Sequence, residues 1–304
     1  MVSLELPQID LMAHGQPLSK SPDRIAWLIP SDPHTSMPEL QRQYRAQGYL
    51  WLKGILPRDR VEKFREMYFR AFAELGMLKP GTNPVDGIGA ENFPASAHVR
   101  KLEAQVVRWA VFEAFCFMPE IVNFYEAFLG GHTYLHKRKM LRRTSAGSTW
   151  STPAHYDLIY LRGGTDKSLC TSWIPFGDIP VEMGGLVYLE GSDAAGRRYE
   201  AEFTANNTSL SPEERISAFN KNMEEGGSLA EDLTDLANRL NMRWLIANYE
   251  SGDMVIHSPY MIHAATTNQD AHGRMRLSAD IRYQRVDDEI DQRWRFDWYP
   301  GDNL

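Results

Sequence analysis

The stretch from Trp150 to Tyr160 carries a histidine and an aspartate at a spacing that suits a metal site. His155 and Asp157 are two residues apart, so in an extended strand both side chains project from the same face. A second histidine from elsewhere would complete a two-histidine, one-carboxylate set, which suits iron(II) and leaves positions open for substrate and oxygen. An H-x-D tripeptide also occurs in polar surface strands, so the pair needs support from the rest of the chain.

Two histidines near the carboxyl end are candidates for the third ligand. They lie in the segment 250–268, where Pro259 forces a bend between two apolar stretches. We expect His263, which follows the bend, to face the earlier pair. His257 precedes the bend, and we interpret it as a core or supporting histidine rather than a ligand.

A strand with three arginines follows these histidines. In an alternating strand over 274–283, Arg274, Arg276 and Arg282 share one face. A buried arginine is costly unless it meets an anion, and its forked guanidinium is well suited to a carboxylate. A dicarboxylate co-substrate bound to the metal at one end and to arginine at the other would meet that need. Arg282 is equally compatible with a structural ion pair.

The composition bounds the class of protein. The chain has 304 residues, 43% of them hydrophobic and 24% charged, which predicts a packed globular core. A net charge of −7 argues against a nucleic-acid groove, and two cysteines, Cys116 and Cys170, exclude a disulfide framework. With no signal-like amino terminus and no apolar run of about 18 residues, we expect a cytoplasmic protein without a membrane span. Its partner would be a small-molecule substrate; a monomer and a homodimer both remain open.

Helical patterns dominate the first half of the chain and short strands the second. We expect an irregular arm over 1–37, helices over 37–46, 58–75 and, in two pieces, 101–129, and strands over 49–52, 132–141, 168–176, 185–189, 253–257 and 275–284. A polar, helix-prone insertion covers about 193–245. Helices followed by strands without βαβ alternation predict an α+β fold on an antiparallel sheet, in a single domain over 1–304.

Several motifs occur together in a recognisable order. They are Tyr44-Arg-Ala-Gln-Gly-Tyr-Leu-Trp-Leu, His155-Tyr-Asp157, Gly184-Gly-Leu-Val-Tyr-Leu-Glu-Gly-Ser192, and Gly252-Asp253 followed by His263 and the arginine strand. Over about residues 40–285 the chain resembles the phytanoyl-CoA dioxygenase (PhyH) family of iron(II)- and 2-oxoglutarate-dependent oxygenases. The resemblance implies a double-stranded β-helix core, of jelly-roll or cupin type, with N-terminal helices packed on the sheet.

The resemblance also implies roles for particular residues. His155, Asp157 and His263 would bind iron(II), and Arg276 would hold 2-oxoglutarate, with Arg274 as a competitor because loop length before this arginine varies in the family. The remaining candidates are Trp173, Met140 and Tyr156 for the co-substrate pocket, and Lys139 and Trp150 for the substrate side. Core packing is at least as good an explanation for both tryptophans.

The activity implied by the resemblance is an oxygenase that consumes 2-oxoglutarate and O2 and releases succinate and CO2. An aspartate at position 157, where halogenating relatives have a small residue, favours hydroxylation, desaturation or ring formation at a C–H bond. A basic run over 137–143 is either an exposed strand edge or a contact to an anionic substrate. The rival classes are a non-redox metal-binding isomerase or ligand-binding module, and a scaffold with a vestigial site.

Overall fold

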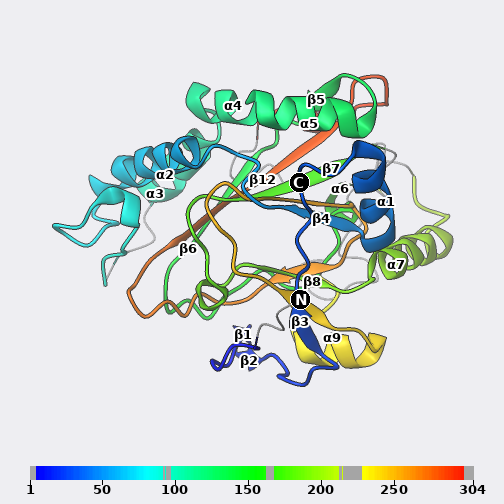
Figure 1. Ribbon diagram of the computed structural model, residues 1–304, viewed down its shortest axis with the longest axis horizontal. Helices are drawn as coiled ribbons and strands as arrows, with labels where there is room; N and C mark the ends of the chain where they lie inside the picture. The colour runs from blue at the N-terminus through cyan, green and yellow to red at the C-terminus, as the bar shows by residue number, and fades with distance from the viewer. Residues whose placement is uncertain are drawn as a thin grey trace.

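Two β-sheets that face each other form the centre of the molecule (Figure 1). The computed structural model describes residues 5–91, 93, 97–161, 168–211, 214 and 228–297. The larger sheet has the order β4 (Tyr49–Leu52), β10 (Met254–His257), β7 (Cys170–Pro175), β12 (Arg276–Arg285) and β5 (Thr133–Leu135), and β6 (Met140–Thr144) also pairs with β12. The smaller sheet has the order β11 (His263–Ala265), β8 (Leu186–Leu189), β9 (Trp244–Ile246) and β3 (Ile25–Trp27).

Side-chain alternation divides each strand between the space inside the two sheets and the layers outside them. On β12, Leu277, Ala279 and Ile281 join the outer hydrophobic cluster beneath the helices, and the residues between them point inward. On β7, Ile174 joins the same outer cluster, whereas Trp173 packs in the cluster between the sheets. The polar inward positions of β12 therefore lie in the space that the two sheets enclose.

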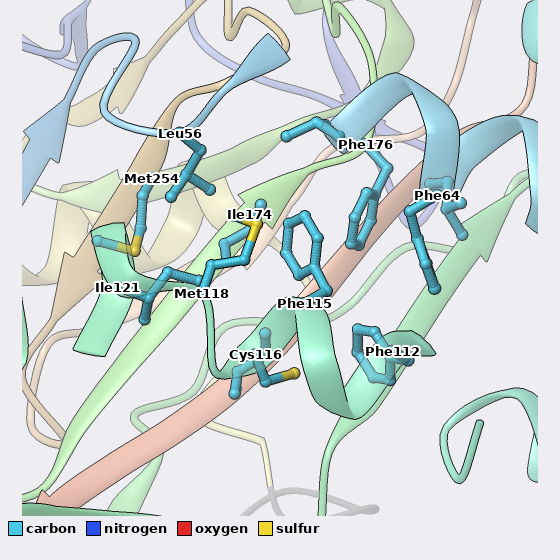
Figure 2. Packing of buried hydrophobic residues seen from close by; sticks show 14 of the residues in the cluster. Leu56, Phe64, Phe112, Phe115, Cys116, Met118, Ile121, Ile174, Phe176 and Met254 are labelled. Atoms are coloured by element: carbon cyan, nitrogen blue, oxygen red, sulfur yellow. The ribbon is translucent and has the colours of Figure 1, made fainter. Parts of the chain in front are cut away.

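Helices cover the outer face of the larger sheet. They are α2 (Arg58–Ala73), α3 (Ala97–Val106), α4 (Ala110–Cys116) and α5 (Pro119–Leu129), with α1 (Met37–Gln47) next to β4. Figure 2 shows Phe64 of α2 and Phe115 of α4 gathered around Phe176, which follows β7. The ring centroids of Phe64 and Phe115 lie 4.6 Å and 5.0 Å from that of Phe176. This aromatic packing anchors the helical layer to the strand that carries Trp173.

The outer face of the smaller sheet packs under a second hydrophobic cluster. Helices α7 (Asp193–Asn206) and α9 (Leu233–Leu240) lie on this side, together with a hairpin of β1 (Met12–Ala13) and β2 (Gln16–Pro17). Leu233 and Leu236 of α9 pack in the cluster with Trp244, whose indole N–H donates to the carbonyl oxygen of Leu233 at 2.7 Å. The rest of the expected insertion, residues 212–213 and 215–227, lies outside the described residues.

The expected α+β architecture with a double-stranded β-helix core is confirmed, and three local features differ from expectation. The strand expected over 132–141 is two strands, because the chain leaves the sheet to bury Lys139 against Glu113. The helical region after Lys101 breaks at Trp109 as well as before Pro119. The arm over 1–37 contains short strands, of which β3 adds to the smaller sheet parallel to β9. Among the described residues, no helix has the length and apolar character of a membrane span.

Candidate metal centre

Three side chains that the sequence analysis selected converge between the two sheets. One donor atom from each of His155, Asp157 and His263 can be chosen so that all three lie within 4.8 Å of one another, and all three residues are buried. The Nε2 atoms of the two histidines lie 3.8 Å and 3.7 Å from the same oxygen, Oδ1 of Asp157. Two neutral nitrogens and one carboxylate oxygen on one side of a small space suit a divalent transition metal such as iron(II).

The backbone fixes both histidines in the same orientation. His155 and His263 pair as an isolated antiparallel bridge, with N–H···O distances of 3.0 Å and 2.9 Å in the two directions. Each ring places Nδ1 at hydrogen-bond distance from a carbonyl oxygen two residues earlier, that of Pro153 at 2.8 Å and that of Met261 at 2.9 Å. These carbonyls favour the tautomer with hydrogen on Nδ1, which leaves the Nε2 lone pairs free for a metal.

The electrostatics of the three groups match the protonation state that a metal requires. Burial lowers the pKa of His155, and it lowers that of His263 well below its usual value with help from the neighbouring histidines. Burial alone would raise the pKa of Asp157, but Arg282 and the nearby His257 and His263 outweigh it and hold this pKa well below its usual value. The site therefore presents two neutral imidazoles and an ionised carboxylate near neutral pH.

His257 faces the other oxygen of the carboxylate, although its ring also lies 4.4 Å from that of His263. Its Nε2 is 3.6 Å from Oδ2 of Asp157, the oxygen that does not face the other histidines, and its Nδ1 lies 3.1 Å from the hydroxyl of Tyr188. This geometry supports the interpretation of His257 as a supporting residue.

A second group of polar atoms on the inner walls lacks partners. Arg276 is buried on β12, and its Nε has no hydrogen-bond partner among the described residues. The same holds for the hydroxyl of Ser278, two residues along the strand, and for the indole N–H of Trp173 on β7. Tyr249 lies beside Trp173, with the two ring centroids 4.6 Å apart, and burial raises the pKa of its hydroxyl against an opposing effect of the Arg276 charge. Buried donors without partners are costly, so this wall is suited to an anionic ligand such as a carboxylate.

The two arginines proposed for the co-substrate have different surroundings. Burial, together with repulsion from Arg142, lowers the pKa of Arg276 to about 10, so it stays protonated near neutral pH. The guanidinium of Arg274 forms a two-nitrogen pair with Asp270, at 3.0 Å and 2.6 Å, and its side chain is 34% exposed. Of the two, Arg276 is the one whose hydrogen-bonding capacity is unfilled inside the barrel. Ser278 was missed in the sequence, although the strand period that selected Arg276 also selects it.

The other selected residues are distributed over several environments. Met140 lies opposite Asp280 on the inner wall, with its sulfur 3.9 Å from Arg142. The hydroxyl of Tyr156 donates to Glu200 of α7 at 2.9 Å.

Lys139 is buried outside the sheet, where its ammonium group lies 3.3 Å from Glu113 and 3.6 Å from Asp297. Trp150 is 58% exposed. In the basic run, Lys137, Arg142 and Arg143 each pair with an acidic residue, namely Glu113, Asp280 and Glu103. Only Arg142 lies on the inner wall, as the register partner of Ser278.

Comparisons with known proteins agree with this geometry. The model of the family described as Phytanoyl-CoA dioxygenase (PhyH) matches residues 44–276, well over half of the chain. Two curated relatives, the 1-deoxypentalenic acid 11-beta-hydroxylases of Streptomyces arenae and Streptomyces exfoliatus, are 25% and 27% identical, each over 81% of this chain and 80% of their own. The peroxisomal phytanoyl-CoA dioxygenase of Mus musculus is 24% identical over 59% of this chain and 53% of its own.

Solved structures share the fold at low sequence identity. EctD from S. alaskensis with bound Fe has a TM-score of 0.55 at 15% identity, over 92% of this chain and 89% of its own. The epimerase SnoN in complex with Fe3+, alpha ketoglutarate and nogalamycin RO has a TM-score of 0.52 at 17% identity, over 82% and 84%. The fold and the converging donors define a double-stranded β-helix protein with a histidine–aspartate–histidine site. The chain belongs to the phytanoyl-CoA dioxygenase family, and it is an iron(II)- and 2-oxoglutarate-dependent oxygenase.

Proposed function

We propose that the protein hydroxylates an unactivated C–H bond of a small metabolite that carries one carboxylate. In this proposal His155, Asp157 and His263 bind iron(II), and Arg276, with Ser278 and Trp173, holds the distal carboxylate of 2-oxoglutarate. The observation that carries it is the convergence of two histidine nitrogens on one oxygen of Asp157. Three ligands on one side leave the other side of the metal for co-substrate and oxygen.

The chain's own residues supply positioning and charge. Iron(II) held there, with 2-oxoglutarate and O2, supplies oxidation of a C–H bond coupled to decarboxylation of the co-substrate. Arg276 orients the co-substrate by a charge-assisted contact in a water-poor wall. The retained carboxylate of Asp157 occupies the position that must be vacant for a halide, which favours transfer of oxygen to the substrate.

The charges on the inner walls support an acidic substrate. Among the described residues, the charged side chains at the metal site and at the inward positions of β6 and β12 are Arg142, Arg276, Arg282, Asp157 and Asp280. They leave one positive charge in excess. The two charges of iron(II) and those of the 2-oxoglutarate dianion cancel, so the excess persists in the assembled site. A substrate with a single carboxylate would neutralise it, and this lowers the cost of excluding water. The two Streptomyces relatives are named as hydroxylases of a carboxylic acid.

The proposal is tested by succinate formation from 2-oxoglutarate across a panel of small carboxylic acids and their methyl esters. We expect at least one acid to stimulate succinate release and to gain one oxygen atom by mass spectrometry, and its ester to do so much less. His155→Ala should abolish the stimulated turnover. Arg276→Ala should lower it, and a high concentration of 2-oxoglutarate should recover it. Undiminished turnover in His155→Ala would refute the site. A product isomeric with its substrate, formed without succinate, would instead favour a non-redox isomerase.

A further inference from the structure

We propose that Arg282 and Thr171 are positioning residues that restrict Asp157 to binding the metal through one oxygen. The proposal rests on the function proposed above and concerns the second carboxylate oxygen, Oδ2. Oδ1 of Asp157 faces the two histidines that complete the site, whereas Oδ2 faces other groups. The two oxygens of one carboxylate are thus assigned different tasks.

Three side chains surround Oδ2. The hydroxyl of Thr171 donates a short hydrogen bond to it, Nη2 of Arg282 donates at 3.2 Å, and Nε2 of His257 lies 3.6 Å away. All three residues are buried. A carboxylate oxygen has about two lone-pair sites, so the hydrogen bonds from Thr171 and Arg282 fill its capacity.

The register of the larger sheet places these three residues in one row. Thr171 on β7 is the Cα partner of Arg282 on β12 and also of His257 on β10. Three neighbouring strands therefore contribute one inward side chain each at the same level, and Asp157 lies against that row. Because sheet register is rigid, the row fixes both the position and the rotation of the carboxylate.

Arg282 has no other acidic partner among the ion pairs of the described residues. Its side chain is 7% exposed, its Nε lacks a hydrogen-bond partner, and its ion pair is with Asp157. A buried charge pair can act simply by neutralising the carboxylate. The hydrogen bond from Thr171 indicates positioning in addition to neutralisation, since a neutral hydroxyl orients the carboxylate without adding charge.

The consequence concerns the positions that remain open on the metal. A carboxylate that binds through both oxygens would take one more coordination position than a carboxylate that binds through one. 2-Oxoglutarate needs two positions and oxygen needs one, which a six-coordinate ion offers only if Asp157 uses a single oxygen. Holding Oδ2 away from the metal thus keeps the oxygen position available.

The test uses manganese(II) as a probe for the metal site, because this ion is paramagnetic and binds its ligands in octahedral geometry. Water-proton relaxation is measured for the complex of protein, manganese(II) and 2-oxoglutarate, where one metal-bound water should remain. We expect Thr171→Val and Arg282→Met each to lower the relaxation enhancement at least twofold, because Oδ2 replaces that water, and Arg282→Lys to retain most of it. Arg285→Met, which removes an arginine–aspartate pair at the end of the same strand, is the matched control and should resemble wild type.

Melting temperatures of the metal-free variants separate positioning from stability. Wild-type relaxation in both Thr171→Val and Arg282→Met, with lowered melting temperatures, would overturn the proposal and leave the two residues a purely structural role. Should Arg282→Met fail to fold, Thr171→Val, which conserves volume, decides between these outcomes. Manganese(II) binding that persists in His155→Ala would refute the proposed metal site instead, so the two failures are distinguishable.

Discussion

The guanidinium of Arg276 donates a hydrogen bond to the backbone carbonyl oxygen of Gly184. Gly184 has a φ of +77°, and a Cβ atom there would lie 2.5 Å from the carbonyl oxygen of Thr266, so only glycine fits this turn. The turn before β8 thereby anchors one nitrogen of Arg276, while Nε remains without a partner inside the barrel. An arginine held in this way is pre-organised for an anion.

Replacing Arg276 by methionine should weaken 2-oxoglutarate binding about 10- to 100-fold, because a charge-assisted contact inside the barrel is lost. Anaerobic calorimetry of the iron(II)-loaded protein measures the affinity. Arg274→Met serves as control and should stay within about twofold of wild type, since that guanidinium is already paired with Asp270. A larger loss in Arg274→Met than in Arg276→Met would reverse the assignment.

These two arginines also show where sequence reasoning ends. The strand period placed both on one face, but β12 begins at Arg276, so Arg274 precedes the strand and the alternation does not apply to it. The choice between them depends on Asp270, which folds back from a loop to pair with Arg274. No spacing rule predicts that return.

The metal-binding residues could be predicted from the sequence, whereas a residue that supports them could not. His155, Asp157 and His263 were found because their types and local spacing are distinctive. Thr171 was not found, since its role depends on the register that brings it opposite Arg282 and His257. Register is set by pairing between distant segments, and a common residue type gives no signal of it.

Gly196 of α7 should not tolerate alanine. Glycine within a helix is normally less favourable than alanine by about 1 kcal/mol, but a Cβ here would lie 2.0 Å from the backbone carbonyl oxygen of Tyr260. The helix and the segment leading to His263 must therefore move apart. We expect Gly196→Ala to lower the free energy of unfolding by about 1–3 kcal/mol in urea titrations. Thr204→Ala, at an exposed position of α7, should be neutral or slightly stabilising; equal effects of the two changes would contradict the close approach.

Phe115 should contribute strongly to the packing of the helical layer shown in Figure 2. It is 5% exposed, and its ring lies 5.9 Å from that of Phe64 and 5.0 Å from that of Phe176. Truncation leaves a cavity, so Phe115→Ala should cost about 3–5 kcal/mol of unfolding free energy. Phe117→Ala is the control, because Phe117 is 49% exposed, and it should stay within about 0.5 kcal/mol of wild type. A small effect at both positions would show that this layer adapts to the loss.

His136 should make the protein more sensitive to acid. Its Nε2 lies 2.7 Å from the Gln284 side-chain oxygen, its ring stacks on Trp294, and burial lowers its pKa from 6.5 to about 4. The unfolded chain therefore binds a proton at a higher pH than the folded protein does, so stability falls as pH decreases from about 6.5 towards 4.

Between pH 7 and pH 5 this single group should cost about 2 kcal/mol. The cost should be absent in His136→Gln, whatever the variant's stability at pH 7. Urea titrations at both pH values give the slope of unfolding free energy against pH for wild type and for His136→Gln. The difference between these two slopes cancels the contributions of other groups. His34→Gln, at an exposed histidine, should keep the wild-type slope. A wild-type slope in His136→Gln would mean that this histidine accepts its proton without leaving the core.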